Sequence, residues 1–227
     1  MLGQMNPRSI SVDVVSDVAC PWCYLGKRRL ERAMSLAPDV DVGVRWRPYR
    51  LDPTIPPEGI SRNDYIVGKF GSLEAVRAAH ERLEELGRAE GIDYRFDLIA
   101  RSADTTNAHR LIRWAHAEGK EDAVVERLFA AYFSEGKDIG GTSVLAAVAG
   151  DAGLDPVQIE ARLATDEDRS AVAAEIEEAY RIGVTGVPCF IVGRRYAVAG
   201  AHPGETIAEA IRRAASEADD PVAPAVS

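Results

Sequence analysis

The chain has 227 residues, a formal net charge of −9 and 46% hydrophobic residues. This supplies a sizeable core and predicts one or two domains, while the negative charge argues against nucleic acid as a main partner, because phosphate binding needs a basic face. The opening residues, MLGQMNPRSI, lack the apolar run of a signal peptide, and no apolar stretch approaches the roughly 18 residues of a membrane span. We therefore expect a soluble, cytoplasmic protein with no membrane partner.

The predicted elements begin with a strand, a helix and a second strand. Apolar residues alternate along Ile10–Ser16 and Val40–Trp46, as they do in strands, whereas those of Tyr24–Ala37 lie near helical spacing. The locally basic segment Gly26–Arg32, GKRRLER, is expected to form a solvated helix face, because mixed charge on a helix usually does. The chain thus opens with a βαβ unit.

A long helical block follows a proline-rich connection, Arg47–Gly59. From about Ser61 to Tyr180 the apolar residues recur at helical spacing. The predicted helices cover 73–86, 108–115, 124–132 and 144–149, a segment that begins with Asp155 as N-cap and Pro156 at the first helical position, and a last segment that includes 175–180.

Two strands and a helix complete the pattern. The sequences VPCFIVG (187–193) and RRYAVAG (194–200) predict strands joined around Gly193–Arg194, and 202–218 predicts a helix. The polar, proline-containing tail 219–227 is expected to be disordered. We predict an α/β fold in which the flanking parts, 8–58 and 181–218, form one mixed sheet and residues 59–180 form an all-helical insertion domain.

The motif Cys20–Pro21–Trp22–Cys23 lies where the first strand gives way to a helix. A sulfur at a helix N-terminus faces unpaired backbone N–H groups and the positive end of the helix dipole, so the pKa of the Cys20 thiol is expected below the free value of about 8.5. Residues three apart share a helix face, so Cys20 and Cys23 can form a disulfide. We predict Cys20 as the exposed attacking thiol and Cys23 as the deeper, resolving thiol.

The cysteine pair could also be a zinc site or a coincidence of two buried cysteines. A zinc site needs a second pair of ligands, but Cys189 and the four histidines show no paired spacing, and His109 and His116, seven residues apart, are expected at the surface. We therefore predict no metal. A coincidental pair stays open, but a redox pair is favoured for a chain with three cysteines in a reducing compartment.

A second candidate feature is the peptide bond Val187–Pro188. Proline at the first residue of a strand removes no ladder donor, and an X–Pro bond adopts the cis form at a cost of about 0.5–1 kcal/mol. A cis bond would turn the Val187 backbone toward the cysteine pair, where it could hydrogen-bond a partner's extended chain; an ordinary trans proline is the alternative. Cys189 should point into the core, as an inert buried thiol rather than a third redox partner.

Together these features resemble the thioredoxin-fold DsbA family, and most closely its cytoplasmic FrnE-like branch of disulfide oxidoreductases. The resemblance extends from Val12 to about Arg213 and is carried by SDVACPWCYLGKRRLE, RWRPYRLDP, TNAHRL and GVTGVPCFIVGRRYAVAGAHPGE. It implies a thioredoxin fold with a helical insertion, with Cys20 as nucleophile, Cys23 as resolving thiol and Pro188 as a cis-proline that faces them. The related kappa-class and 2-hydroxychromene-2-carboxylate isomerases have a serine where this chain has Cys20, which argues against that activity.

The resemblance also implies residues that contact the substrate. Trp22 and Val187 flank the predicted site, and Asn107, His109 and Arg110 resemble a family segment that can face the active-site cleft. For the last three, a capped helix with a solvated polar edge is the alternative.

The leading hypothesis is a protein-disulfide oxidoreductase or isomerase that works through a mixed disulfide on Cys20. Its expected partners are disulfide-containing proteins, peptides or small-thiol conjugates. No tightly bound cofactor is expected, although a low-molecular-weight thiol such as glutathione could take part. Two alternatives stay open: an isomerase or transferase that uses such a thiol on small aromatic or electrophilic substrates, and a non-catalytic thioredoxin-like binding module.

Overall fold

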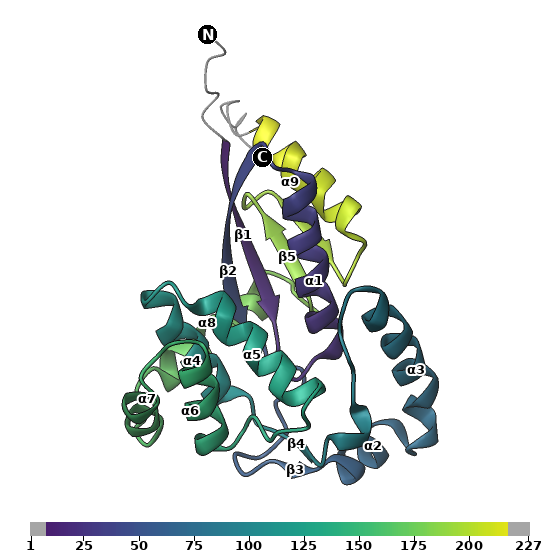
Figure 1. The fold of residues 1–227 in the computed structure, drawn as a ribbon, viewed down its shortest axis with the longest axis vertical. Helices are drawn as coiled ribbons and strands as arrows, with labels where there is room; N and C mark the ends of the chain where they lie inside the picture. The colour runs from purple at the N-terminus through teal and green to yellow at the C-terminus, as the bar shows by residue number, and fades with distance from the viewer. Residues whose placement is uncertain (1–7, 218–227) are drawn as a thin grey trace.

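The computed structural model describes residues 8–217, and its centre is a four-stranded mixed sheet (Figure 1). The strands are β1 (Arg8–Ser16), β2 (Val40–Pro48), β5 (Cys189–Val192) and β6 (Tyr196–Ala199), in the order β2-β1-β5-β6. Strand β1 is parallel to β2 and antiparallel to β5, and β5 is antiparallel to β6. The predicted mixed sheet, built from both flanking parts of the chain, is confirmed.

Two helices, α1 (Pro21–Leu36) and α9 (Gly204–Glu217), cover one face of this sheet (Figure 1). Every second residue of β1 points toward them, because side chains alternate across a strand. Val12 and Val14 of β1 are buried in the same core as Leu25 of α1 and Ile207 of α9. This core fixes the N-terminal end of α1 against the end of β1, where the cysteine pair lies.

The remaining helices lie between β2 and β5 in sequence and form the other end of the molecule (Figure 1). They are α2 (Arg62–Phe70), α3 (Glu74–Ala89), α4 (Thr106–Ala117), α5 (Glu121–Phe133), α6 (Thr142–Asp151), α7 (Pro156–Leu163) and α8 (Arg169–Arg181), with a 3₁₀ turn at Phe96–Leu98. The predicted helical block is confirmed; its limits at residues 59 and 180 stay predictions, and the predicted tail 219–227 lies outside the described residues.

Two short strands make this block not all-helical, and helix α2 and the 3₁₀ turn were not predicted either. Strands β3 (Ile60–Ser61) and β4 (Arg101–Ser102) pair antiparallel, and each is too short to show an alternating pattern. Helix α2 buries only Ile66, so the sequence shows no clear apolar face. Its N-cap is nevertheless readable, because Ser61 Oγ accepts a hydrogen bond from Asp64 N at 3.5 Å.

Helix α1 is fastened to α5 by aromatic stacking and by a buried lysine. The rings of Tyr24 and Phe129 stack with centroids 5.1 Å apart. Lys27 is 2% exposed, and its Nζ lies 3.1 Å from Asp122 Oδ2 and 3.3 Å from Glu126 Oε2. The prediction of a solvated face is therefore wrong for Lys27, because α5 covers it with carboxylates. No helix within residues 8–217 combines the length and apolar character needed to cross a membrane.

Candidate active site

Cys20 is the N-cap residue of α1, and its extended backbone makes the turn between strand and helix. Its φ and ψ are −95° and 115°, and Pro21 occupies the first helical turn. The turn is closed by main-chain hydrogen bonds, from Cys20 N to Asp17 O and from Cys23 N to Cys20 O, each 3.0 Å long. As predicted, the sulfur of Cys20 is attached where a helix presents its unpaired N–H groups.

The structure places Cys20 inside the protein, which corrects the prediction of an exposed thiol. The residue is only 3% exposed. Its Sγ contacts the main-chain oxygen of Val187 at 3.7 Å, within hydrogen-bonding range for a thiol. The loop before β5 therefore covers the Cys20 sulfur. A substrate sulfur must reach Cys20 at the position that this loop borders.

Cys23 lies one turn further into α1 and is 1% exposed. Burial raises the pKa of its thiol well above the usual range, and the neighbouring sulfur of Cys20 raises it further. Both cysteines are in the free thiol form. The two sulfurs are thus close enough to interact, and Cys23 holds its proton more firmly than an exposed thiol does.

The Val187–Pro188 peptide bond is cis, the form that the sequence allowed. The Pro188 ring packs against α1 at Gly26, where an added Cβ would lie 2.8 Å from Pro188 Cγ and 3.2 Å from Phe190 Cζ. Gly26 therefore lets the loop approach the helix closely. This approach brings the Val187 oxygen to Cys20.

Tyr94, a residue that no motif in the sequence marks, also borders the cysteine pair. Its hydroxyl donates a 2.6 Å hydrogen bond to the main-chain oxygen of Pro21. Burial raises the pKa of the Tyr94 hydroxyl, and the nearby Cys20 sulfur adds to the rise. A neutral tyrosine from the insertion thus holds the first turn of α1, and no local pattern in the sequence indicates this contact.

Asp17 and His109 form a buried polar pair behind the same turn. Asp17 accepts hydrogen bonds from Ala19 N at 3.1 Å and Leu51 N at 2.7 Å. His109 Nε2 lies 2.9 Å from Tyr49 O and 3.7 Å from Asp17 Oδ1. Burial alone would raise the pKa of the Asp17 carboxyl, but His109 and these N–H groups outweigh it and lower that pKa.

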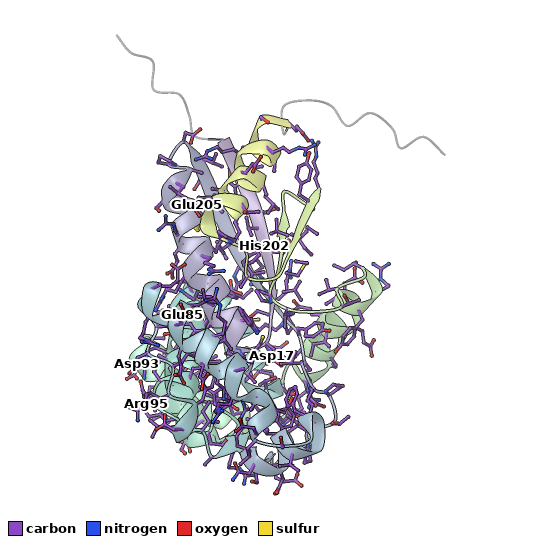
Figure 2. All side chains as sticks on the ribbon, turned by 90° about the vertical axis from the view of Figure 1, so that its right-hand side faces the viewer. Asp17, Glu85, Asp93, Arg95, His202 and Glu205 are labelled. Atoms are coloured by element: carbon purple, nitrogen blue, oxygen red, sulfur yellow. The ribbon has the colours of Figure 1, made fainter. Side chains whose placement is uncertain are left out.

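This arrangement corrects one prediction about His109, which was expected at the surface and is 4% exposed. Figure 2 shows Asp17 near the middle of the molecule, between its sheet part and its helical part. The proximity of Asp17 and His109, 92 positions apart, has no signature in the local sequence.

Asn107 and Arg110 have different surroundings from His109. Arg110 is fully buried, and its guanidinium donates to Asn107 Oδ1 and to four main-chain oxygens, two in the last turn of α7 and two in the connection from α7 to α8. The bonds to Thr165 O and Glu167 O, for example, are 2.8 Å and 2.6 Å long. Arg110 therefore stabilises the α7–α8 region, and its guanidinium does not lie at the cysteine pair.

Trp22 and Cys189 complete the set of predicted residues. The Trp22 side chain, between the cysteines, is 38% exposed and lies at the surface beside the motif. Cys189 is 5% exposed and packs among Val15, Ala179 and Val184, so its predicted burial is confirmed. Within the part of the chain that the structure describes, no cluster of three or more histidine, cysteine, aspartate or glutamate residues could hold a metal ion.

Comparison with known proteins places this geometry in a family. Residues 11–212 match the family model of the DSBA-like thioredoxin domain. A probable DsbA oxidoreductase from Streptomyces coelicolor, SCO1869, is 32% identical, with a TM-score of 0.86 and 94% and 93% of the two chains covered. The uncharacterized protein YwbO of Bacillus subtilis is 29% identical over 189 residues, which cover 82% of this chain and 88% of YwbO.

A more distant structure shares the fold alone. A 2-hydroxychromene-2-carboxylate isomerase is 21% identical and superposes with a TM-score of 0.70 over 94% of this chain and 100% of its own. The fold likeness to these isomerases agrees with the resemblance in the sequence. On the match over residues 11–212, the chain belongs to the DSBA-like thioredoxin domain family.

Proposed function

We propose that this protein is a thiol–disulfide oxidoreductase in which Cys20 attacks a substrate disulfide and Cys23 resolves the product. Membership of a thiol-oxidoreductase family supports the general activity. The observation that carries the specific proposal is the position of Cys20 at the N-terminus of α1, with the Val187 oxygen 3.7 Å from its sulfur. One helix end thus offers an attacking sulfur, and one peptide group offers an acceptor for the incoming chain.

The reaction is an exchange of sulfur–sulfur bonds. The Cys20 thiolate bonds to one sulfur of the substrate disulfide, and the other sulfur leaves as a thiolate that takes a proton from solvent. Cys23 then attacks the Cys20 sulfur, forms the Cys20–Cys23 disulfide and releases the second substrate thiolate. In sum the substrate is reduced and the enzyme is oxidised, and the reverse sequence oxidises a dithiol.

The surface beside the motif supports a peptide or small-thiol substrate. Trp22 supplies an exposed aromatic face, and the main chain of Val187 can hydrogen-bond an extended chain in place of its contact with Cys20. We place the enzyme in the cytoplasm, where reduction or isomerisation suits its free thiols.

The test is substrate trapping. Cys23→Ser with an oxidised peptide should accumulate a covalent adduct on Cys20 that dithiothreitol releases, observed by mass spectrometry. Cys20→Ser should form no adduct and should lose insulin-reductase activity. The matched control Cys189→Ser should retain that activity, and the double variant Cys23→Ser/Cys189→Ser should still form the adduct. Equal insulin turnover by the wild type and Cys20→Ser would contradict the proposal.

Access to the buried sulfur can be measured separately. Iodoacetamide should label Cys20 in the native protein faster than Cys23 or Cys189, as quantified by peptide mapping. If Cys20 reacts only after denaturation, the loop that carries Val187 does not open to substrates, and the proposed chemistry fails.

A further inference from the structure

A small cavity lies behind the cysteine motif, between the sheet and the insertion. Its volume is about 10 Å³, and Ser16 of β1, Arg45 and Trp46 of β2 and His109 of α4 are among its lining residues. A cavity of about 10–15 Å³ accommodates one water molecule when polar groups surround it. The cavity is therefore large enough for one water molecule.

Some of the buried polar atoms at this cavity make no hydrogen bond within the protein. Among the described residues, three buried side-chain polar atoms make no hydrogen bond: Ser16 Oγ, Arg45 Nη1 and Trp46 Nε1. All three belong to residues that line this one cavity, although Arg45 Nη1 has an ionic partner in Glu121 Oε1 at 3.6 Å. An unpaired buried polar atom costs about 1–3 kcal/mol, so this coincidence points to a ligand that accepts hydrogen bonds from Trp46 Nε1 and from the Ser16 hydroxyl.

Water fits that description. It accepts two hydrogen bonds, here from Trp46 Nε1 and from the Ser16 hydroxyl, and donates one to a further acceptor. His109 can provide that acceptor. Its Nε2 donates to Tyr49 O at 2.9 Å, since a carbonyl oxygen can only accept, and in the neutral ring the other nitrogen then carries a lone pair.

The series formed by His109, the water molecule and Ser16 ends at Cys23. Its thiol must lose a proton to attack a mixed disulfide, yet the residue is 1% exposed and burial raises the pKa of the thiol. Ser16 lies beside Cys23, close enough to lower that pKa in part, although the two side chains make no full hydrogen bond. A hydroxyl can take up one proton while it passes on another.

We propose that the cavity binds one water molecule, and that Ser16, this water and His109 carry away the proton that Cys23 releases when it resolves the mixed disulfide. This inference rests on the proposed function. The S–H bond of Cys23 breaks, the Cys23–Cys20 bond forms, and the substrate thiolate leaves. The proton arrives on His109, where Asp17 Oδ1, 3.7 Å from the ring, stabilises the imidazolium.

The other ionisable groups at the cavity are poorer acceptors. Arg45, Arg47 and Arg113 line it as cations, and Glu175 is the remaining acid. Glu175 is held by two of them, with Arg47 Nη1 3.2 Å from its Oε2 and Arg113 on its Oε1. Both carboxylate oxygens of Glu175 therefore already have cationic partners.

The test separates the two chemical steps. Reduced enzyme in excess is mixed with dithionitrobenzoate, in a Cys189→Ala background so that only two thiols report. Attack by Cys20 releases the first thionitrobenzoate in a bimolecular phase, and attack by Cys23 releases the second in a unimolecular phase. Ser16→Ala and His109→Gln should each slow the second phase about a hundredfold or more at pH 7, the lower end of the range for general base catalysis, and leave the first within twofold.

Matched variants and pH complete the design. His116→Gln makes the same change two turns along α4, away from the cavity, and Glu175→Gln removes the competing acceptor; neither should alter the second phase. The deficit of His109→Gln should shrink as pH rises, since hydroxide then removes the proton, whereas a structural defect would persist.

Three results would overturn the inference: a second phase unchanged in Ser16→Ala and His109→Gln, equal slowing of both phases, or slowing by Glu175→Gln in place of His109→Gln. Absence of the first phase in the Cys189→Ala protein would instead refute the proposed function.

Discussion

The contact between Gly26 and Pro188 gives the sharpest stability prediction. In Gly26→Ala the new Cβ would lie 2.8 Å from Pro188 Cγ and 3.2 Å from Phe190 Cζ, whereas carbon atoms prefer about 3.5–4.0 Å. A proline ring cannot turn aside, so overpacking should cost about 1–3 kcal/mol. Alanine restores about 0.8–1 kcal/mol of helix propensity. The net loss in the free energy of unfolding should be about 0–2 kcal/mol.

Gly68 provides the matched control. It lies exposed in α2, and an added Cβ there meets no atom within 4 Å. Gly68→Ala should therefore raise the free energy of unfolding by about 0.5–1 kcal/mol through propensity alone. The propensity gain is common to both variants, so Gly26→Ala should be about 1–3 kcal/mol less stable than Gly68→Ala.

Urea denaturation of the reduced proteins, followed by circular dichroism, measures both values by linear extrapolation. The m-values should stay equal, because neither change alters the surface exposed on unfolding. If Gly26→Ala proved as stable as Gly68→Ala, the Pro188 loop would not press on α1. In that case, the close approach at Gly26 would not determine the position of Val187.

Three further predictions follow from buried polar groups. Tyr94→Phe removes the hydrogen bond to Pro21 O and should cost about 0.5–1.5 kcal/mol in urea denaturation; an unchanged midpoint would dismiss that contact. Arg110→Met should cost about 2–4 kcal/mol, because several main-chain oxygens lose their donor, yet should leave exchange activity per folded molecule unchanged; selective loss of activity would restore a substrate role. Burial raises the pKa of the Glu121 carboxyl from 4.5 to about 7. The contribution of the Glu121 carboxyl to the free energy of unfolding is therefore fully present below pH 4.5, and it is lost as pH rises through about 7. Relative to the wild type, Glu121→Gln should gain about 1–3 kcal/mol in the free energy of unfolding as pH rises from 5 to 8. This range is lower than the pKa shift alone would give, because solvent reaches the site near His116. A stability difference that does not vary with pH would contradict this prediction.

The elements of the sheet could be predicted because their signals are local. Alternation along Ile10–Ser16 and Val40–Trp46 reports burial on one face, and the strand-to-helix position of Cys20 follows from the order of the elements. The cis state of Val187–Pro188 was an allowed option that the structure realises. These features need no knowledge of which distant segment lies opposite.

What could not be predicted depends on contacts between distant segments. Lys27 resembles the other basic residues of α1 in sequence, and only the packing of α5 buries it. The burial of Cys20 depends on Val187, 167 positions away, and the pairing of Asp17 with His109 depends on how the insertion meets the sheet. Such contacts leave no periodic trace in the sequence.

The central position of β1 has a consequence for how the protein is made. The strand hydrogen-bonds to β2 on one side and to β5 on the other, yet the 140 residues from 49 to 188 separate these neighbours. At about 5–20 residues per second, a ribosome needs roughly 7–28 s to synthesise that interval. During this time the nascent β1 has one open edge and an uncovered apolar face, a template for mispairing, so chaperone demand should be greatest before β5 emerges.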